Sequence, residues 1–171
     1  MMMELILACA PNVAPSTIQE IIRVESNSDP IAVNINTKGG VSYPYKKPKT
    51  KQQAIALAHA AIAAGHTVDM GYMQVNSANL KKMGYTVREM FHECTNLKAG
   101  ANILITAYSD AALIHGPGQI ALRAALSRYN TGSFSRGFYN GYVARYVNVP
   151  AVASGTLNPY TADTSVWRQP Y

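Results

Sequence analysis

One glutamate in the sequence has the residue type and the position of a catalytic acid. Residues 15–25 (PSTIQEIIRVE) predict a helix, with an apolar stripe formed by Ile18, Ile21 and Ile22. The next position of that stripe is Glu25. Burial of a carboxyl group raises its pKa, and a raised pKa lets a general acid hold its proton at neutral pH. The alternative is that the stripe ends at Ile22 and that Glu25 is a solvated residue of the last turn.

Two further segments carry groups suited to sugar binding. Residues 71–76 (GYMQVN) place an aromatic ring, a thioether and an amide in one extended stretch, which could line a saccharide groove or form a core strand with a helix cap. Residues 129–132 (YNTG) place an aromatic ring and an amide on a predicted tight turn, where they could stack on a sugar and bind its hydroxyl groups. A plain turn is the alternative for this second segment.

The elements that must position these residues are mostly helices. Capping residues and apolar periodicity predict helices at 15–25, 50–64, 76–84, 119–128 and 136–147. A capping box at Thr86 and Glu89 predicts the start of another helix, and the longest one should run from Thr95 to a break at 116–118. Residues 31–36 alternate in polarity before a turn at 36–40, which predicts a short β-hairpin, and residues 68–75 are strand-like. We therefore expect an α+β fold, predominantly helical, with one domain over 1–149 and a Pro/Ser/Thr-rich C-terminal tail over 150–171.

Composition limits the class of protein. The chain has 171 residues, of which 48% are hydrophobic and 14% charged, so a sizeable core is possible and general disorder is excluded. No apolar run is long enough to span a bilayer. Residues 1–10 are apolar but lack a basic start, and we expect them to begin a mature or trimmed domain. The two cysteines, Cys9 and Cys94, could form one disulfide or remain two buried thiols.

Motifs for metals and nucleotides are missing from the sequence. The four histidines form no H-E-x-x-H, and residues 92–94 (HEC) have no matching cluster, so we expect no metal site. We find no P-loop, dinucleotide fingerprint or G-x-S-x-G, and expect no cofactor.

The formal net charge of +6 is concentrated in one connector, residues 44–51. Its four lysines are Lys46, Lys47, Lys49 and Lys51. A nucleic-acid interface would need a reading helix or a stacking platform, and only Tyr43 and Tyr45 lie beside these lysines. We expect a solvated connector, or attraction to an anionic or polyanionic partner, and no nucleic-acid partner.

Four motifs occur in a specific order along the chain. They are Glu25-Ser26 with Asp29-Pro30, Gly71-Tyr72-Met73-Gln74, Tyr129-Asn130-Thr131-Gly132, and Tyr142 in a later predicted helix. In this order they resemble the Slt-type lytic transglycosylases of the lysozyme-like superfamily. Residues 9–11 (CAP) and 94–97 (CTNL) resemble the specialised enzymes of type IV secretion and conjugation systems. The resemblance covers residues 9–149, about four-fifths of the chain.

The resemblance implies a lysozyme-like single domain with Glu25 as the sole catalytic acid and base. The groove residues that it implies are Ser26, Met73, Gln74, Tyr129, Asn130 and Tyr142. It also favours a disulfide between Cys9 and Cys94. Two departures stand out: Arg128 replaces the small residue that usually precedes Tyr-Asn, and residues 33–40 (VNINTKGG) replace a Gly-rich stretch. The arginine could alter the groove wall or contact an anionic peptide stem.

The implied function is lytic cleavage of the MurNAc-β-1,4-GlcNAc bond in peptidoglycan, which leaves 1,6-anhydro-MurNAc ends and locally opens the cell wall for a secretion or conjugation apparatus. This chemistry needs one carboxyl group. A lysozyme-type hydrolase needs two, and Asp69 is a better partner for Glu25 than Asp29, which we expect to cap or turn the chain. A non-catalytic peptidoglycan-binding scaffold module is the third alternative. The expected location is the periplasm, after removal of a signal peptide, as a monomer beside the secretion machinery.

Overall fold

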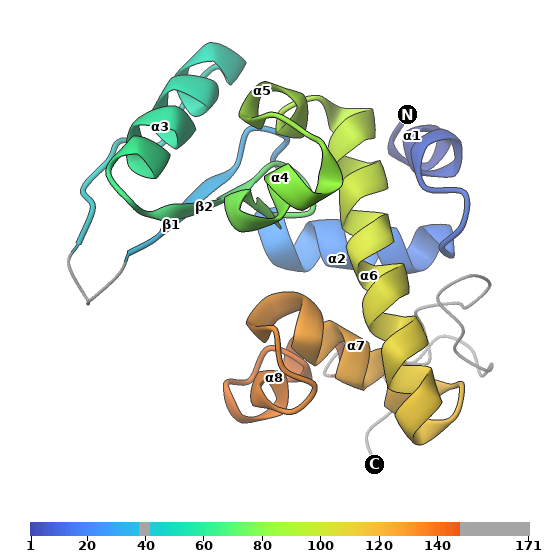
Figure 1. Cartoon of the computed structure of the whole chain (residues 1–171). Helices are drawn as coiled ribbons and strands as arrows, with labels where there is room; N and C mark the ends of the chain where they lie inside the picture. The colour runs from blue at the N-terminus through green and yellow to red at the C-terminus, as the bar shows by residue number, and fades with distance from the viewer. Residues whose placement is uncertain (38–41, 148–171) are drawn as a thin grey trace. The chain divides into compact units, whose positions relative to one another are not determined.

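The computed structural model describes residues 1–37 and 42–147, and these are mostly helical (Figure 1). The helices are α1 (Met2–Cys9), α2 (Pro15–Ser26), α3 (Lys51–Ala63), η2 (Ser77–Asn79, a 3₁₀ turn), α4 (Leu80–Met83), α5 (Val87–Met90), α6 (Glu93–His115), α7 (Gln119–Thr131), α8 (Arg136–Tyr139) and α9 (Ala144–Val147). The strands are β1 (Val33–Asn36), β2 (Thr67–Met70) and β3 (Val75–Asn76). Within the two described ranges, no helix combines the length and apolar character needed to cross a bilayer. The predicted tail at 150–171 lies outside the described residues.

The chain divides into two compact units. The sheet unit is residues 21–100 and holds the three strands together with α3, α4 and α5. The helical unit comprises, among the described residues, 1–20 and 101–147, and it holds α1, α7, α8 and α9. Helices α2 and α6 each run from one unit into the other along the chain.

The sheet unit is organised by an antiparallel sheet of order β1-β2-β3. Val33 pairs with Met70 and Ile35 with Val68, so the apolar residues of β1 and β2 share one face. Val68 and Met70 are fully buried on that face. The burial gained by matching these two apolar patterns selects the partner of β1.

The hairpin predicted at residues 31–40 is wrong in the partner of its first strand, and residues 38–40 of its predicted turn lie outside the described residues. The strand forms at Val33–Asn36, but its partner is β2, which follows only after α3. The hairpin of this fold is β2–β3, connected by residues 71–74. Local turn residues suggested a nearby partner, whereas the buried face required a distant one.

Several predicted helix boundaries are confirmed because they depend on local caps. Thr50 accepts a hydrogen bond from the Gln53 backbone N–H at the start of α3. Thr86 and Glu89 form the predicted capping box of α5. Gly84, with a φ of 72°, ends α4 in the left-handed conformation. The longest helix, α6, begins at Glu93, two residues before the predicted start.

Two predictions in the helical unit are corrected. The tight turn predicted at 129–132 is the last turn of α7, which continues to Thr131 and ends at Gly132 with a φ of 72°. The Gly132 N–H still donates to the Arg128 carbonyl (2.7 Å), and the Thr131 hydroxyl donates to the Ser127 carbonyl (2.7 Å) within this turn. The single helix predicted at 136–147 is two short helices, α8 and α9, separated at residues 140–143. Gly141, with a φ of 78°, interrupts them.

Candidate functional site

Glu25 lies in the last turn of α2 and is half-buried. The stripe that precedes it is confirmed, because Ile18, Ile21 and Ile22 are all at most 1% exposed. Immediately after α2, Asn27 and the next residue, Ser28, have positive φ angles of 51° and 62°. Such left-handed backbone is uncommon for residues other than glycine and turns the chain sharply away from the helix. Glu25 is thus a partly buried acid at an abrupt helix end.

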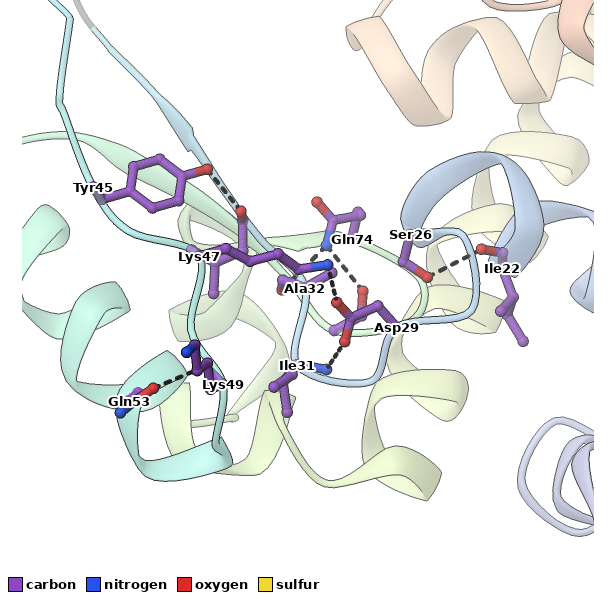
Figure 2. A network of polar contacts seen from close by, with 12 residues as sticks. Ile22, Ser26, Asp29, Ile31, Ala32, Tyr45, Lys47, Lys49, Gln53 and Gln74 are labelled. Atoms are coloured by element: carbon purple, nitrogen blue, oxygen red, sulfur yellow. Dashed lines mark hydrogen bonds and ion pairs between the residues drawn. The ribbon is translucent and has the colours of Figure 1, made fainter.

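The residues that follow Glu25 form a tight polar turn, shown in Figure 2. The Ser26 hydroxyl donates to the Ile22 carbonyl at 3.0 Å. Asp29 uses one carboxylate oxygen to accept a hydrogen bond from the Ile31 N–H (3.0 Å) and the other to pair with Lys47 Nζ (2.9 Å). The expectation that Asp29 turns the chain is confirmed, and both of its oxygens have structural partners.

The connection between β2 and β3 is built on two left-handed residues. Gly71 has a φ of 72°, and a Cβ atom there would lie 2.7 Å from the Met90 carbonyl oxygen, so only glycine fits. Gln74 has a φ of 46°. Its side-chain amide donates to the carbonyls of Gly71 (2.9 Å) and Ala32 (3.3 Å), as Figure 2 shows. Gln74 therefore ties this connection to the turn that follows α2.

Met73 lies in the interior of the sheet unit, at 0% exposure. Its side chain packs against Gly100 of α6, where a Cβ atom would come within 2.5 Å of the Met73 Cβ. Its backbone N–H donates to Asn96 Oδ1 (2.8 Å). These contacts give Met73 a supporting role under the β2–β3 connection, and the predicted substrate contact still depends on the resemblance alone.

Asn96 is a structural residue that the sequence analysis did not single out. It is 1% exposed, and its side-chain amide donates to the carbonyls of Met70 (2.8 Å) and Met90 (2.9 Å) while accepting from Met73. The available signal was an amide beside Leu97 in the apolar stripe of a predicted helix, because a buried amide needs buried partners.

Asp69, the predicted partner of a two-acid mechanism, lies in a row of asparagines across the sheet. Asn34, Asp69 and Asn76 are direct neighbours in the register of the three strands. One oxygen of Asp69 accepts from Asn36 (2.7 Å) and Asn34 (3.1 Å), and the other accepts from Asn76 (2.6 Å). The sequence signal for this row was the alternation of asparagines in residues 33–36, which we did not connect with Asp69.

The phenol of Tyr72, in the β2–β3 connection, has a raised pKa. It is 8% exposed. Burial raises the pKa of the Tyr72 hydroxyl above its ordinary value, and the negative charges of Glu93 and Asp29 raise it further. The phenol is therefore neutral at physiological pH and can act as a hydrogen-bond donor.

The helical unit carries the other predicted sugar-binding residues. Tyr129 is half-buried and Asn130 exposed in the last turn of α7. Asn140 links two of the motifs, because its amide donates to Asn130 Oδ1 (3.2 Å) and its oxygen accepts from the Tyr142 N–H (2.9 Å). Tyr142 lies outside any helix, is 2% exposed, and shares a 2.8 Å hydroxyl–hydroxyl hydrogen bond with Tyr146.

Arg128, the departure before Tyr-Asn, is held within the helical unit. Its guanidinium pairs with the Asp110 carboxylate and lies 4.9 Å from the centre of the Phe134 ring. The arginine is only half-buried at this place. Its charge therefore has an intramolecular partner, which weakens the case for a stem-peptide contact at this residue.

The remaining candidate features are the two cysteines and the side chains that could bind a metal ion. Cys9 and Cys94 are both disulfide-bonded, and the chain has no other cysteine, so the pairing favoured by the resemblance is confirmed. Among the residues that the structure describes, no three His, Cys, Asp or Glu side chains are grouped so that they could hold a metal ion.

Comparison with known proteins gives one family. Residues 3–146 match the family described as "Transglycosylase SLT domain". The chain is 39% identical over 154 residues to "Protein virB1" of Agrobacterium fabrum, which covers 90% of this chain and 60% of that protein. It is 42% identical over 137 residues to "Protein virB1" of Rhizobium radiobacter, with 80% and 55% covered.

A third relative is "Type IV secretion system protein virB1" of Brucella abortus, 37% identical over 166 residues, which cover 95% of this chain and 68% of that protein. The chain thus spans somewhat more than half of the length of the first two relatives. No solved structure matches it significantly. The match over most of the chain, together with the Glu25 turn and the Gly71–Gln74 connection, shows that this chain belongs to the transglycosylase SLT domain family.

Proposed function

We propose that the chain is a peptidoglycan lytic transglycosylase with Glu25 as its catalytic acid and base. The observation that carries this proposal is the place of Glu25: a half-buried carboxyl group that ends a buried apolar stripe at a sharply turned helix terminus. A partly buried carboxyl group is suited to hold and then donate a proton. Asp29, the nearest acid in sequence, is engaged by Ile31 and Lys47 and is thereby withdrawn from the chemistry.

In the proposed reaction Glu25 donates its proton to the oxygen of the MurNAc–GlcNAc bond, and the bond from C1 of MurNAc to that oxygen breaks. The GlcNAc side leaves as an alcohol. The resulting Glu25 carboxylate then removes the proton of the MurNAc 6-hydroxyl while that oxygen bonds to C1. The product is a 1,6-anhydro ring, Glu25 recovers its proton, and no water is consumed.

Two side chains of the sheet unit, Ser26 and Gln74, offer hydrogen-bonding groups to a sugar. The Ser26 hydroxyl donates to Ile22, so its oxygen remains an acceptor for a sugar hydroxyl. Gln74 donates through its amide nitrogen, and its Oε1 makes no hydrogen bond with the described residues, so that oxygen can accept as well. Tyr129, Asn130 and Tyr142 are proposed sugar-binding residues on the strength of the resemblance.

The names of the relatives extend the proposal to a cellular role. One relative is a type IV secretion system protein. We infer that this chain acts in the periplasm and opens peptidoglycan locally for a secretion or conjugation apparatus. Its substrate would then be the glycan strand at the site of assembly.

A lysozyme-type hydrolase is the second candidate, in which Asp69 would act beside Glu25. Asp69 accepts hydrogen bonds from three amide groups, so both of its oxygens have structural partners, as those of Asp29 do. In that mechanism Asp69 would have to leave these partners in order to stabilise a cationic sugar or attack it. Water would then complete the reaction and leave a reducing end rather than an anhydro ring.

Product analysis of two variants separates these possibilities. Glu25→Gln should keep the fold and lose lytic activity by at least about 100-fold, since general acid–base catalysis contributes about 10²–10⁴-fold. Activity at the wild-type rate would remove Glu25 from its role. Asp69→Asn should retain activity and anhydro-ended muropeptides, read by mass spectrometry.

The other possible outcomes would support the hydrolase or the scaffold instead. Lost activity in Asp69→Asn, with reducing-end products from the wild type, would favour the hydrolase. Because an asparagine cannot accept from all three neighbouring amides, a denaturation curve of Asp69→Asn must first show that it is folded. Peptidoglycan binding by the wild type without any release of muropeptides would favour a scaffold.

A further inference from the structure

A basic segment of the sheet unit is anchored beside the turn that follows α2. We define the lysine strap as residues 43–51, which contain Lys46, Lys47, Lys49 and Lys51. Four contacts hold this segment in place. The Tyr43 ring packs edge-on against the His66 ring (5.2 Å between centroids), and the Tyr45 hydroxyl donates to the Val33 carbonyl (2.9 Å). Lys47 Nζ forms an ion pair with Asp29 (2.9 Å), and the Lys49 N–H donates to Gln53 Oε1 (2.8 Å). Figure 2 shows the last three of these contacts.

The anchors leave most of the positive charge of the lysine strap available. Lys47 is the only one of its four lysines that makes an ion pair with the described residues. The side chains of Lys46, Lys49 and Lys51 are exposed. Pro48 is buried and fixes the local backbone, so the charged side chains project from an ordered segment.

The sheet unit does not supply an anion for these lysines. Among its described residues, nine lysines and arginines stand against five carboxylates. Three of these acids have other partners: Asp29 is paired with Lys47, Asp69 with three asparagines, and Glu89 with Thr86. The three exposed lysines are therefore open to a negatively charged ligand.

We propose that the lysine strap binds the carboxylates of the peptide stems carried by peptidoglycan. The proposal rests on the proposed function, because it names the part of that substrate which the strap would recognise. The ion pair from Lys47 to Asp29 fixes the strap to the turn that begins two residues after Glu25. A stem peptide hangs from the lactyl group of MurNAc, so a sugar at Glu25 would carry its stem close to this segment.

The chemistry of lysine suits such a ligand. Stem peptides are flexible and carry several free carboxylates at differing distances from the sugar. A lysine ammonium is a compact charge on a flexible chain and does not require the fixed bidentate geometry of arginine. Three such charges on one ordered segment would therefore favour stem-bearing glycan over bare glycan.

The test compares binding of three soluble probes that the enzyme cannot shorten further: a disaccharide with its stem peptide, the same compound with the stem carboxylates converted to amides, and the bare disaccharide. The wild type should bind the first probe about fivefold more tightly than the other two, as expected for a few exposed charge contacts. The triple variant Lys46→Gln, Lys49→Gln, Lys51→Gln should lose this preference.

A matched control is Lys81→Gln, Lys82→Gln, which removes two exposed lysines of α4 in the same unit and should leave the preference unchanged. Raising the salt concentration to about 0.5 M should also abolish the preference, because exposed charges are screened. Equal wild-type affinity for all three probes, or equal losses in the triple variant and the control, would overturn the proposal. So would salt-sensitive binding of duplex DNA that is tighter than stem binding and is lost in the triple variant.

These binding measurements do not depend on catalysis. If Glu25→Gln cleaved peptidoglycan normally, the proposed catalytic role would fail while the stem preference could still be measured. If the stem preference were absent while Glu25→Gln was inactive, only the lysine strap would lose its assignment.

Discussion

Replacing Asn96 by alanine removes three buried hydrogen bonds at once. The amide accepts from the Met73 N–H and donates to the carbonyls of Met70 and Met90, over distances of 2.8–2.9 Å. The side chain is 1% exposed, so water cannot readily replace it. Each lost bond costs about 1–1.5 kcal/mol, and we therefore expect Asn96→Ala to lower the free energy of unfolding by about 3–5 kcal/mol.

Asn96→Asp distinguishes the hydrogen bonds from the packing, because it keeps nearly the same shape. Its carboxylate can still accept from Met73 but would face the carbonyl oxygens of Met70 and Met90 without a proton to donate. We expect a loss at least as large as that of the alanine variant, measured at neutral pH by urea unfolding.

The matched control is Asn102→Ala, at an exposed position of the same helix, which should change stability by no more than about 0.5 kcal/mol. Comparison of the unfolding slopes checks that all variants unfold in the same way. Asn96→Ala within about 1 kcal/mol of the wild type would refute the reasoning, since three buried bonds could not then be lost without replacement.

Two further predictions concern a covalent link and a helix cap. Reduction of the disulfide, or the double variant Cys9→Ala, Cys94→Ala, should lower the free energy of unfolding by about 4–5 kcal/mol. This is the value that the chain-entropy model gives for a loop of this length. An unchanged melting curve in reducing buffer would contradict the prediction. The Thr86 hydroxyl and N–H lower the pKa of Glu89 below its ordinary 4.5, so the stabilisation by Glu89 is present above about pH 4.5 and is lost as the pH falls through the lowered value. Glu89→Gln should remove this acid-dependent part, and acid unfolding curves identical to those of the wild type would show that the cap does not contribute.

Local chemistry explains which parts of the fold were predictable. The caps at Thr50 and Thr86 and the glycine end at Gly84 each depend on residues within a few positions, so the sequence predicted them correctly. The end of α7 was predicted too early, because a Tyr-Asn-Thr-Gly run suits both a turn and a final helical turn. In the structure the backbone N–H of Gly132 donates to the Arg128 carbonyl, so the run forms the final helical turn.

In the candidate site, too, the locally determined features were predictable and the tertiary ones were not. The place of Glu25 followed from helical periodicity, and the burial of Ile18, Ile21 and Ile22 confirms the stripe that leads to it. The interior position of Met73 could not be predicted, since it depends on how closely α6 approaches at Gly100.

By itself, the sequence determined the predominantly helical class, the caps, the helix that carries Glu25 and the family motifs, because each of these depends on short-range periodicity or on residue types in order. Only the tertiary structure decided the partner of β1, the asparagines around Asp69, the buried amide of Asn96 and the ion pair between Asp29 and Lys47. Each of these includes a contact between residues 18 or more positions apart, and such contacts are selected by the burial of whole faces and by the satisfaction of buried polar groups, which no local pattern specifies.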